Sequence, residues 1–155
     1  MISNNVTRLL GNRKITYKTF VLPNRKLGAE ETARLLDVPP EIVFKSIVIT
    51  RRGQGKPILA VVPGNKEVDL KALARAIGEK KVTPATQSEA ENLTGLQAGG
   101  ISPLALVNRG FEILIDQSAG DHEAIHVSGG ELGLNIRLAA EDLIQLTRAK
   151  AASIC

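Results

Sequence analysis

A lysine inside an apolar run is the first residue of this sequence that could do chemistry. Lys45 lies within Ile42-Val43-Phe44-Lys45-Ser46-Ile47-Val48-Ile49, whose β-branched composition predicts a buried strand. An unpaired ammonium buried there would be costly, so Lys45 must reach water, an acidic partner or a ligand. Because strand side chains alternate, Lys45 shares a face with Ile47 and not with Phe44. The pattern leaves two interpretations open: a lysine whose head reaches solvent, or a cation that steers a carbonyl or phosphate group.

A glycine-rich segment is the second candidate. Residues 94–103 read Thr-Gly-Leu-Gln-Ala-Gly-Gly-Ile-Ser-Pro. The adjacent Gly99 and Gly100 permit positive φ and a close approach of the backbone to a ligand. Successive amides from Gly100 to Ser102 could then bind an anion or a developing oxyanion, and the Ser102 hydroxyl would add a donor. A tight structural turn is the alternative interpretation.

Other common chemistries find little support in the residue types. Ser102 lacks the Gly-X-Ser-X-Gly context of a serine hydrolase. His122 and His126 are four residues apart, but 124–127 reads as a strand, so they do not form a helical metal pair, and Cys155 is the last residue. The glycine-rich segment 127–134 has neither Walker nor dinucleotide-binding spacing and predicts a hairpin. We therefore predict no metal and no cofactor.

The elements that must position these residues follow from periodicity and capping signals. Helices are predicted over residues 6–10, 70–77, 88–93 and 140–148, with Gly11 ending the first, and over a segment that begins at Ala29 and is ended by Pro39-Pro40. The last residues of the chain are expected to fray. Strands are predicted over residues 15–21, 42–49, 57–63, 112–115, 124–127 and 134–138, with another beginning near 80–82. The mixture of hairpins and helices predicts one α+β domain over residues 1–155, with a mixed, curved, barrel-like sheet flanked by helices.

Composition limits the possible partners. The 155 residues are 43% apolar, contain one cysteine and include no apolar run long enough to span a bilayer. The first residues lack a signal-segment pattern, so we predict a cytoplasmic protein without a membrane partner. The net charge of +4 permits a polyanionic partner, and the 3% aromatic content favours contacts to a nucleic-acid backbone over base stacking. The candidate phosphate-binding residues, which could equally be ordinary solvated surface, are Arg51, Arg52, Lys56, Lys80 and Lys81.

Five short motifs occur in a specific order along the chain. They are Phe44-Lys45-Ser46-Ile47-Val48, Val68-Asp69-Leu70-Lys71, Thr94-Gly95 leading into Gly99-Gly100-Ile101-Ser102-Pro103-Leu104, Val127-Ser128-Gly129-Gly130, and Gly133-Leu134. Each motif is common alone, but together and in this order the chain resembles the YbaK/EbsC family of aminoacyl-tRNA deacylases over nearly its whole length.

The resemblance implies a compact α+β fold and cleavage of the ester that joins an amino acid to the terminal ribose of tRNA. It implies that Lys45 matches the family's pocket lysine and that 99–103 matches its Gly-X-X-X-P loop, so that Lys45, Gly100, Ile101 and Ser102 would carry catalysis. Substrate would contact Leu22, Phe44, Gly99, Pro103, Ser128, Gly129 and Asn135. The attacking group would be the substrate's own thiol, a substrate hydroxyl or water. The implied partners are aminoacyl-tRNA(Pro) and prolyl-tRNA synthetase.

Two departures from the family pattern bear on the amino acid that is removed. Cysteine-specific members carry His-Thr-Tyr at the end of the first strand, where this chain has Phe20-Val21-Leu22, and Asn135 replaces an acidic or hydroxyl residue. Pocket size and polarity decide which small side chain is accepted, so cysteine, alanine, serine or another small residue remain open. A non-catalytic module that binds tRNA or a synthetase is the alternative function, and a small-molecule anion binder is a third.

Overall fold

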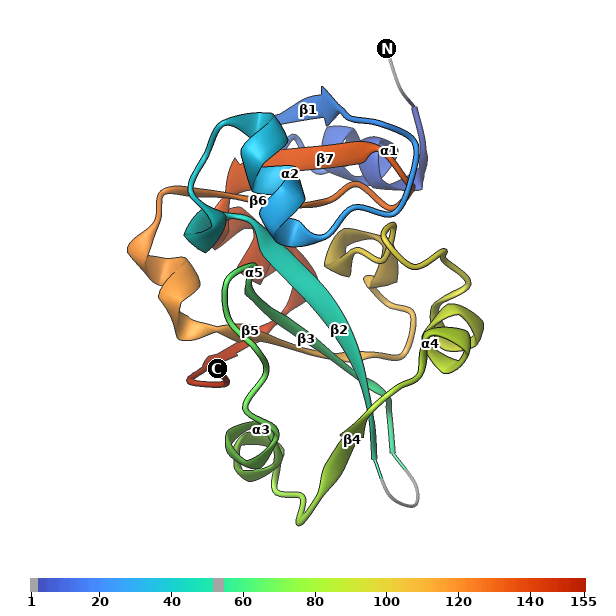
Figure 1. Cartoon of the computed structure of the whole chain (residues 1–155), viewed down its shortest axis with the longest axis vertical. Coiled ribbons are helices and arrows are strands. Elements are labelled where there is room, and N and C mark those ends of the chain that lie inside the picture. The colour runs from blue at the N-terminus through green and yellow to red at the C-terminus, as the bar shows by residue number, and fades with distance from the viewer. Residues whose placement is uncertain (1–2, 52–54) are drawn as a thin grey trace.

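The computed structural model describes residues 3–51 and 55–155 (Figure 1). The helices are α1 (Asn5–Asn12), α2 (Ala29–Leu36), α3 (Leu70–Ile77), α4 (Gln87–Thr94) and α5 (Ala140–Thr147), with 3-10 turns η1 (Pro40–Ile42), η2 (Pro103–Leu106) and η3 (Gln117–Asp121). The strands are β1 (Tyr17–Val21), β2 (Phe44–Arg51), β3 (Ile58–Pro63), β4 (Val82–Pro84), β5 (Glu112–Asp116), β6 (Ala124–Ser128), β7 (Leu134–Ala139) and β8 (Lys150–Ala152). None of the helices within these residues is long and apolar enough to cross a membrane.

The strands of the described residues form two sheets. One has three antiparallel strands in the order β1-β7-β6, and the other has five strands in the order β4-β2-β3-β5-β8. The larger sheet is mixed, because β3 pairs with β5 and β5 with β8 in parallel, whereas β2 pairs with β3 and β4 antiparallel. The predicted α+β class is confirmed. The barrel-like detail is wrong: the chain just before β2 meets β6 through a single bridge between Val43 and His126 instead of a ladder, so the sheets stay separate and neither closes.

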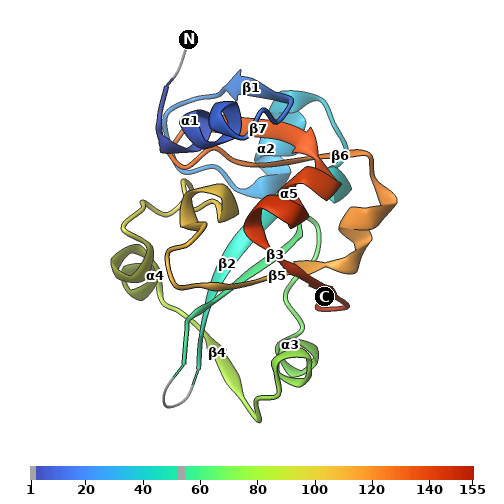
Figure 2. The same ribbon diagram turned by 180° about the vertical axis from the view of Figure 1, so that it is seen from behind.

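The hydrophobic core has two parts because β3 is covered on both faces. The first part lies between the two sheets and is filled by side chains of α1, η2 and α5. Figure 2 shows the helices α1 and α5 from behind. The second part lies between the other face of the five-stranded sheet and α3, where Leu73 and Ala74 pack against Ile58 and Ala60. All six residues of β3 are buried, as expected for a strand covered on both faces.

Capping explains where most helices begin, and proline explains one error in the predicted strands. The side chains of Asp69 and Thr86 accept backbone N–H groups at the starts of α3 and α4, as predicted. The predicted strand start at Ile42 is wrong because Pro40 opens the 3-10 turn η1, so β2 begins at Phe44 and continues to Arg51. Likewise, α1 continues past Gly11 to Asn12.

The end of the chain is anchored, so the prediction that it frays is wrong. Strand β8 pairs in parallel with β5, and the side chain of Ile154 is fully buried. The Ile154 N–H donates to Asp116 Oδ1 at 3.0 Å, and the Asp69 N–H donates to the Ile154 carbonyl at 2.7 Å. Burial acts to raise the pKa of Asp116, but hydrogen bonds from Ser118 and Ile154 outweigh it and lower that pKa. The ionised carboxylate therefore suits its role as the acceptor that holds the tail.

Candidate functional site

A cavity of about 330 Å³ lies where the loop after β1, the start of β2, α4 and the start of β7 meet. Its volume is in the range of small-molecule sites. The residues predicted to touch substrate that line it are Leu22, Phe44, Lys45, Gly99, Ile101, Ser128 and Asn135. Figure 1 shows the elements that carry them, β2 crossing the molecule between the blue β1–α2 segment and the olive segment after α4. The fold thus gathers residues from four distant parts of the chain.

Lys45 lies at this cavity on a strand that separates two environments. Its neighbours Phe44 and Val48 point into the core between the sheets, whereas Ile47 and Ile49 pack on the α3 side, so the predicted alternation of faces is confirmed. The Lys45 side chain is 22% exposed, and its Nζ lies 3.2 Å from Oε1 of Glu67, whose side chain is 93% exposed. An ion pair with so exposed a partner stabilises the fold little. Lys45 can therefore exchange Glu67 readily for a ligand.

The edge of β2 beside the cavity is largely unpaired by strands. Strand β4 pairs only with Ile49–Arg51, and the Val48 carbonyl accepts the Ala85 N–H at 2.9 Å. Because alternate residues of a strand point their backbone polar groups the same way, Ser46 directs its N–H and carbonyl toward this same edge. Ser46 also lines the cavity. Backbone hydrogen-bonding groups are therefore part of the cavity wall.

Two glycines allow the segments at the cavity mouth to approach each other closely. Gly99 has a φ of +93°, and a Cβ there would lie 2.9 Å from Leu132 Cδ2 and 3.2 Å from Lys26 Cα. Gly133 has a φ of +78°, and a Cβ there would lie 2.8 Å from the Leu22 carbonyl oxygen. A side chain at either position would therefore force the mouth open as well as strain the backbone.

Sequence reasoning missed Arg25 and Lys26, two exposed cations that line the cavity. Arg25 pairs with Glu31 at 2.6 Å, and this exposed pair raises the pKa of Arg25 and lowers that of Glu31, mainly through the hydrogen bond. Lys26 Nζ donates to Gln87 Oε1 on α4 at 3.2 Å. The signal in the sequence is only a basic pair after Pro23-Asn24, and nothing local indicates that this loop ends beside Lys45.

Part of the predicted glycine-rich loop is structural and does not line the cavity. The Gly100 N–H donates to the Gln97 carbonyl at 2.8 Å, so it is not free to bind an oxyanion. Ser102 is fully buried, and its Oγ caps η2 by accepting the Leu104 N–H at 3.2 Å, with Pro103 buried as the first residue of that turn. Among the described residues, the amides of Gly99, Ile101 and Ser102 donate to no protein acceptor, and of these residues Gly99 and Ile101 line the cavity, so theirs are the amides of this loop that a ligand can use.

Some residues of the β6–β7 hairpin line the cavity, whereas others only form its turn. Ser128 lines the cavity, and its Oγ accepts the Gly130 N–H at 3.3 Å. Gly129 does not line it, because its N–H donates to the Leu134 carbonyl at 2.8 Å and its own carbonyl accepts Asn4 Nδ2 at 3.0 Å. Gly129 therefore has a structural role in the turn, and it does not lie at the cavity where the predicted contact with substrate would be made.

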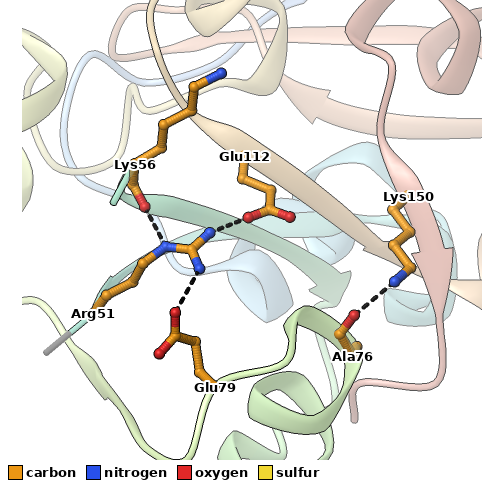
Figure 3. A network of polar contacts seen from close by, with 6 residues as sticks. All are labelled: Arg51, Lys56, Ala76, Glu79, Glu112 and Lys150. Carbon is orange, nitrogen blue, oxygen red and sulfur yellow. Dashed lines mark hydrogen bonds and ion pairs between the residues drawn. The ribbon is translucent and has the colours of Figure 1, made fainter. Parts of the chain in front are cut away.

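Arg51, a predicted phosphate-binding residue, is held in a network of internal contacts (Figure 3). Its guanidinium donates to Glu112, to Glu79 at 3.1 Å and to the Lys56 carbonyl at 2.6 Å, and the side chain is only 11% exposed. These contacts tie β2 to β5 and to the turn after α3. Arg51 is therefore a structural residue and is not available to tRNA phosphates.

The remaining predicted phosphate-binding residues are distributed differently. Lys56, Lys80 and Lys81 are exposed, as a phosphate contact requires. None of the three lines the cavity between β2 and α4. Arg52 lies outside the described residues.

Asn135 and His126 form a buried polar pair beside the cavity. Asn135 lines it and is 5% exposed, and its Oδ1 lies 2.8 Å from Nδ1 of His126, which is 2% exposed. The His126 ring packs against Phe20 with the ring centroids 5.3 Å apart. Burial lowers the pKa of His126, and nearby Arg137 lowers it further, although the Asn135 hydrogen bond opposes both. His126 is therefore neutral at physiological pH.

The charged side chains among the described residues that line the cavity are all cations. Among the described residues that line it, the charged side chains are Arg25, Lys26 and Lys45, and there is no carboxylate, histidine or cysteine. No group of three His, Cys, Asp or Glu side chains in residues 3–51 and 55–155 could hold a metal ion. Elsewhere, burial and the neighbouring Asp116 raise the pKa of the Cys155 thiol to about 11, so it stays protonated. The cavity thus suits an anionic or oxygen-rich ligand.

Comparisons with known sequences agree with this geometry. Residues 24–146 match the model of a family described as "Aminoacyl-tRNA editing domain". Over 152 residues, the chain is 36% identical to the "Putative Cys-tRNA(Pro)/Cys-tRNA(Cys) deacylase EbsC" of Enterococcus faecalis, and the match covers 97% of this chain and 92% of that protein. A proline–tRNA ligase of Levilactobacillus brevis is 31% identical over 65% of this chain, but the match covers only 17% of the ligase. The chain therefore resembles one segment of that ligase.

Solved structures show the same fold. A hypothetical protein of known crystal structure superposes with a TM-score of 0.89 at 22% identity, and the match covers 97% of this chain and 99% of that one. A "putative trans-editing enzyme for prolyl tRNA synthetase" superposes with a TM-score of 0.80 at 23% identity, covering 99% of this chain and 98% of the other. At these identities the superpositions support the fold.

Proposed function

Because the chain belongs to the aminoacyl-tRNA editing family, we propose that it cleaves the ester joining a wrongly attached amino acid to the terminal ribose of a tRNA. The observation that carries this proposal is the cavity, whose described lining residues include three cations and the backbone edge of β2 but no carboxylate. An aminoacyl ester offers carbonyl and ribose oxygens, and a phosphodiester follows immediately along the tRNA. We further propose that residues 1–155 act as one editing domain in trans.

Lys45 is the residue that acts on the ester. Its ammonium can leave the exposed Glu67 carboxylate and donate to the carbonyl oxygen, where negative charge develops during attack. The Ile101 amide, which also lines the cavity, can add a second donor to the same oxygen. Holding the ester in one orientation contributes as well, because it replaces a chance encounter by a fixed geometry. The pocket therefore supplies positioning and charge stabilisation.

The attacking group comes from water or from the substrate. The described lining residues include the hydroxyls of Ser46 and Ser128, but no histidine or carboxylate lies among them to act as a base. In the water route, the water oxygen forms a bond to the carbonyl carbon, the ester C–O bond breaks, the ribose oxygen takes a proton from the water, and the amino acid is released. In a thiol-assisted route, a substrate sulfur forms the S–C bond, the ester C–O bond breaks, and the ribose oxygen takes the thiol proton. Product analysis distinguishes hydrolysis from this intramolecular transfer.

Arg25 and Lys26 are placed to contact the phosphodiesters next to the terminal ribose. Both are exposed at the mouth of the cavity that would hold the ester. Lys56, Lys80 and Lys81 would contact phosphates farther along the acceptor stem. Contacts of this kind provide affinity without sequence choice and weaken as salt rises. The choice of tRNA therefore depends on other contacts, including presentation by prolyl-tRNA synthetase.

The test is ester loss from tRNA(Pro) charged separately with cysteine, alanine, serine and proline, measured with the purified protein. We expect release of one or more of the small noncognate residues, with Leu22 in the cavity wall favouring an apolar or small side chain over one that needs a tyrosine partner. Proline should remain attached. If no ester is lost while tRNA is still bound, the protein is instead a non-catalytic tRNA-binding module.

A further inference from the structure

The pair formed by His126 and Asn135 differs from the other buried polar side chains in the described residues. Thr7, Thr32, Thr94, Ser102, Asp116 and Thr147 each hydrogen-bond to backbone groups, where they cap helices, close turns or anchor the tail. His126 and Asn135 instead bond to each other, from neighbouring strands, at 2.8 Å. No helix or turn of the fold needs this bond, although each buried polar group needs a partner.

The direction of this hydrogen bond fixes which end of the Asn135 amide faces the cavity. Asn135 Oδ1 has only lone pairs to offer, so His126 Nδ1 must carry the proton and donate it. The Asn135 NH2 group is then the free end. Among described residues, the only inaccessible side-chain nitrogen or oxygen without a partner is Ser118 Oγ. Asn135 Nδ2, which has no protein partner there, is therefore open to the cavity that Asn135 lines.

We propose that His126 is a positioning residue: it holds the Asn135 amide so that its NH2 group donates to an uncharged oxygen of the substrate. This proposal rests on the proposed function. It adds to that function that Asn135 presents a hydrogen-bond donor to the substrate. With Oδ1 turned toward His126, Asn135 presents its donor end to the cavity, so the substrate ammonium is expected to lie elsewhere. The oxygen that fits is either one common to every aminoacyl ester, in the carbonyl or ribose, or the side-chain hydroxyl of serine.

A first test needs no catalytic activity. The tautomer of His126 can be read from the ring nitrogen chemical shifts in ¹⁵N NMR spectra of the free protein. We expect a neutral ring protonated on Nδ1, because only that form donates to Asn135 Oδ1. A ring protonated on Nε2 alone would overturn the proposal. Because this measurement uses no tRNA, its result stands even if the protein proves to be inactive as a deacylase.

A double-mutant cycle tests whether His126 affects ester cleavage through Asn135. His126→Phe keeps a ring beside Phe20 but removes the donor, so the Asn135 amide is free to turn. We expect it to lower kcat/KM about 10- to 100-fold, as loss of an outer partner that orients a contacting residue commonly does. In an Asn135→Ala background, the same change should have no further effect. Equal losses in both backgrounds would show a merely structural role and overturn the proposal.

One further variant and a comparison of two substrates separate the alternatives. His126→Gln retains an N–H donor and should recover part of the activity, which also covers the case in which His126→Phe fails to fold. If His126→Gln folds, as judged by thermal unfolding, but is as inactive as Asn135→Ala, the donor role is overturned. A loss shared by alanyl and seryl esters assigns the bonded oxygen to the carbonyl or ribose. A loss confined to seryl esters assigns it to the side chain.

Discussion

Strand β2 carries a cation near each end, and the two have opposite relations to the carboxylates around them. Lys45 has one partner, Glu67, which is almost fully exposed, at 3.2 Å. Arg51 has two carboxylate partners, Glu79 and Glu112, and also donates to a main-chain carbonyl while remaining only 11% exposed (Figure 3). Because solvent screens the Lys45 pair more than the less exposed Arg51 network, Lys45 changes partners more readily than Arg51.

This difference separates a functional cation from a structural one on a single strand. Arg51 joins β2 to β5 and to the turn after α3 at the end of the sheet away from the cavity (Figures 1 and 3). Its planar guanidinium matches several acceptors at once, which suits a permanent junction. Lys45 has a single point charge at the cavity, which suits a ligand that arrives and leaves. Breaking the two pairings should therefore affect different properties of the protein.

The largest effect is expected from Lys45→Ala. Loss of the ammonium removes the donor that faces the developing oxyanion, so kcat/KM for the best aminoacyl-tRNA should fall about 100-fold or more. The free energy of unfolding should change by less than about 1 kcal/mol, because the lost ion pair is exposed. Quench assays of ester loss and urea denaturation measure the two quantities. Undiminished turnover by a folded Lys45→Ala protein would remove Lys45 from the mechanism.

Arg51→Ala should show the reverse pattern. It leaves Glu79 and Glu112 without their shared partner, so the protein should lose about 2 to 3 kcal/mol of unfolding free energy. At temperatures where the variant is folded, kcat/KM should stay close to that of the parent protein. Lys56→Ala is the matched control, because Lys56 contacts Arg51 only through its main-chain carbonyl and its loss should leave stability unchanged. A stable but inactive Arg51→Ala protein would contradict the structural role.

The sequence predicted the elements well because their signals are local. Asp69 and Thr86 stand at the starts of α3 and α4 as expected, and the alternation in β2 placed Lys45 correctly relative to Phe44. It could not distinguish Lys45 from Arg51, because Glu67, Glu79 and Glu112 lie 22, 28 and 61 residues away from the cations they pair with. Such pairings depend on the tertiary fold and leave no periodic trace.

Only part of the candidate site could be predicted from the sequence, because its residues are brought together by the tertiary fold. Ser102 was assigned to catalysis, although a serine directly before proline is also the pattern that begins a short helical turn, and the structure uses it in that way. Arg25 and Lys26 were missed because their importance comes from the closeness of their loop to Gly99, 73 residues or more along the chain. The expectation that the last residues fray is wrong, because pairing of β8 with β5 and the burial of Ile154 hold the end of the chain.

The smallest effect is expected from neutralising one carboxylate partner of Lys45 and one of Arg51. This pair of changes tests the difference between the two cations most directly. Glu67→Gln removes the charged partner of Lys45 and should change kcat/KM by no more than about twofold and stability by no more than about 0.5 kcal/mol. Glu79→Gln makes the same chemical change at the Arg51 network, where the carboxylate is only 30% exposed, and should cost about 1 kcal/mol. Parallel urea titrations and kinetic assays would compare them. If Glu67→Gln instead reduced kcat as strongly as Lys45→Ala, Glu67 would be orienting Lys45 during catalysis. The carboxylate partner of Lys45 would then have a catalytic role and those of Arg51 a structural one, and the strength of the two pairings would not explain the difference between the cations.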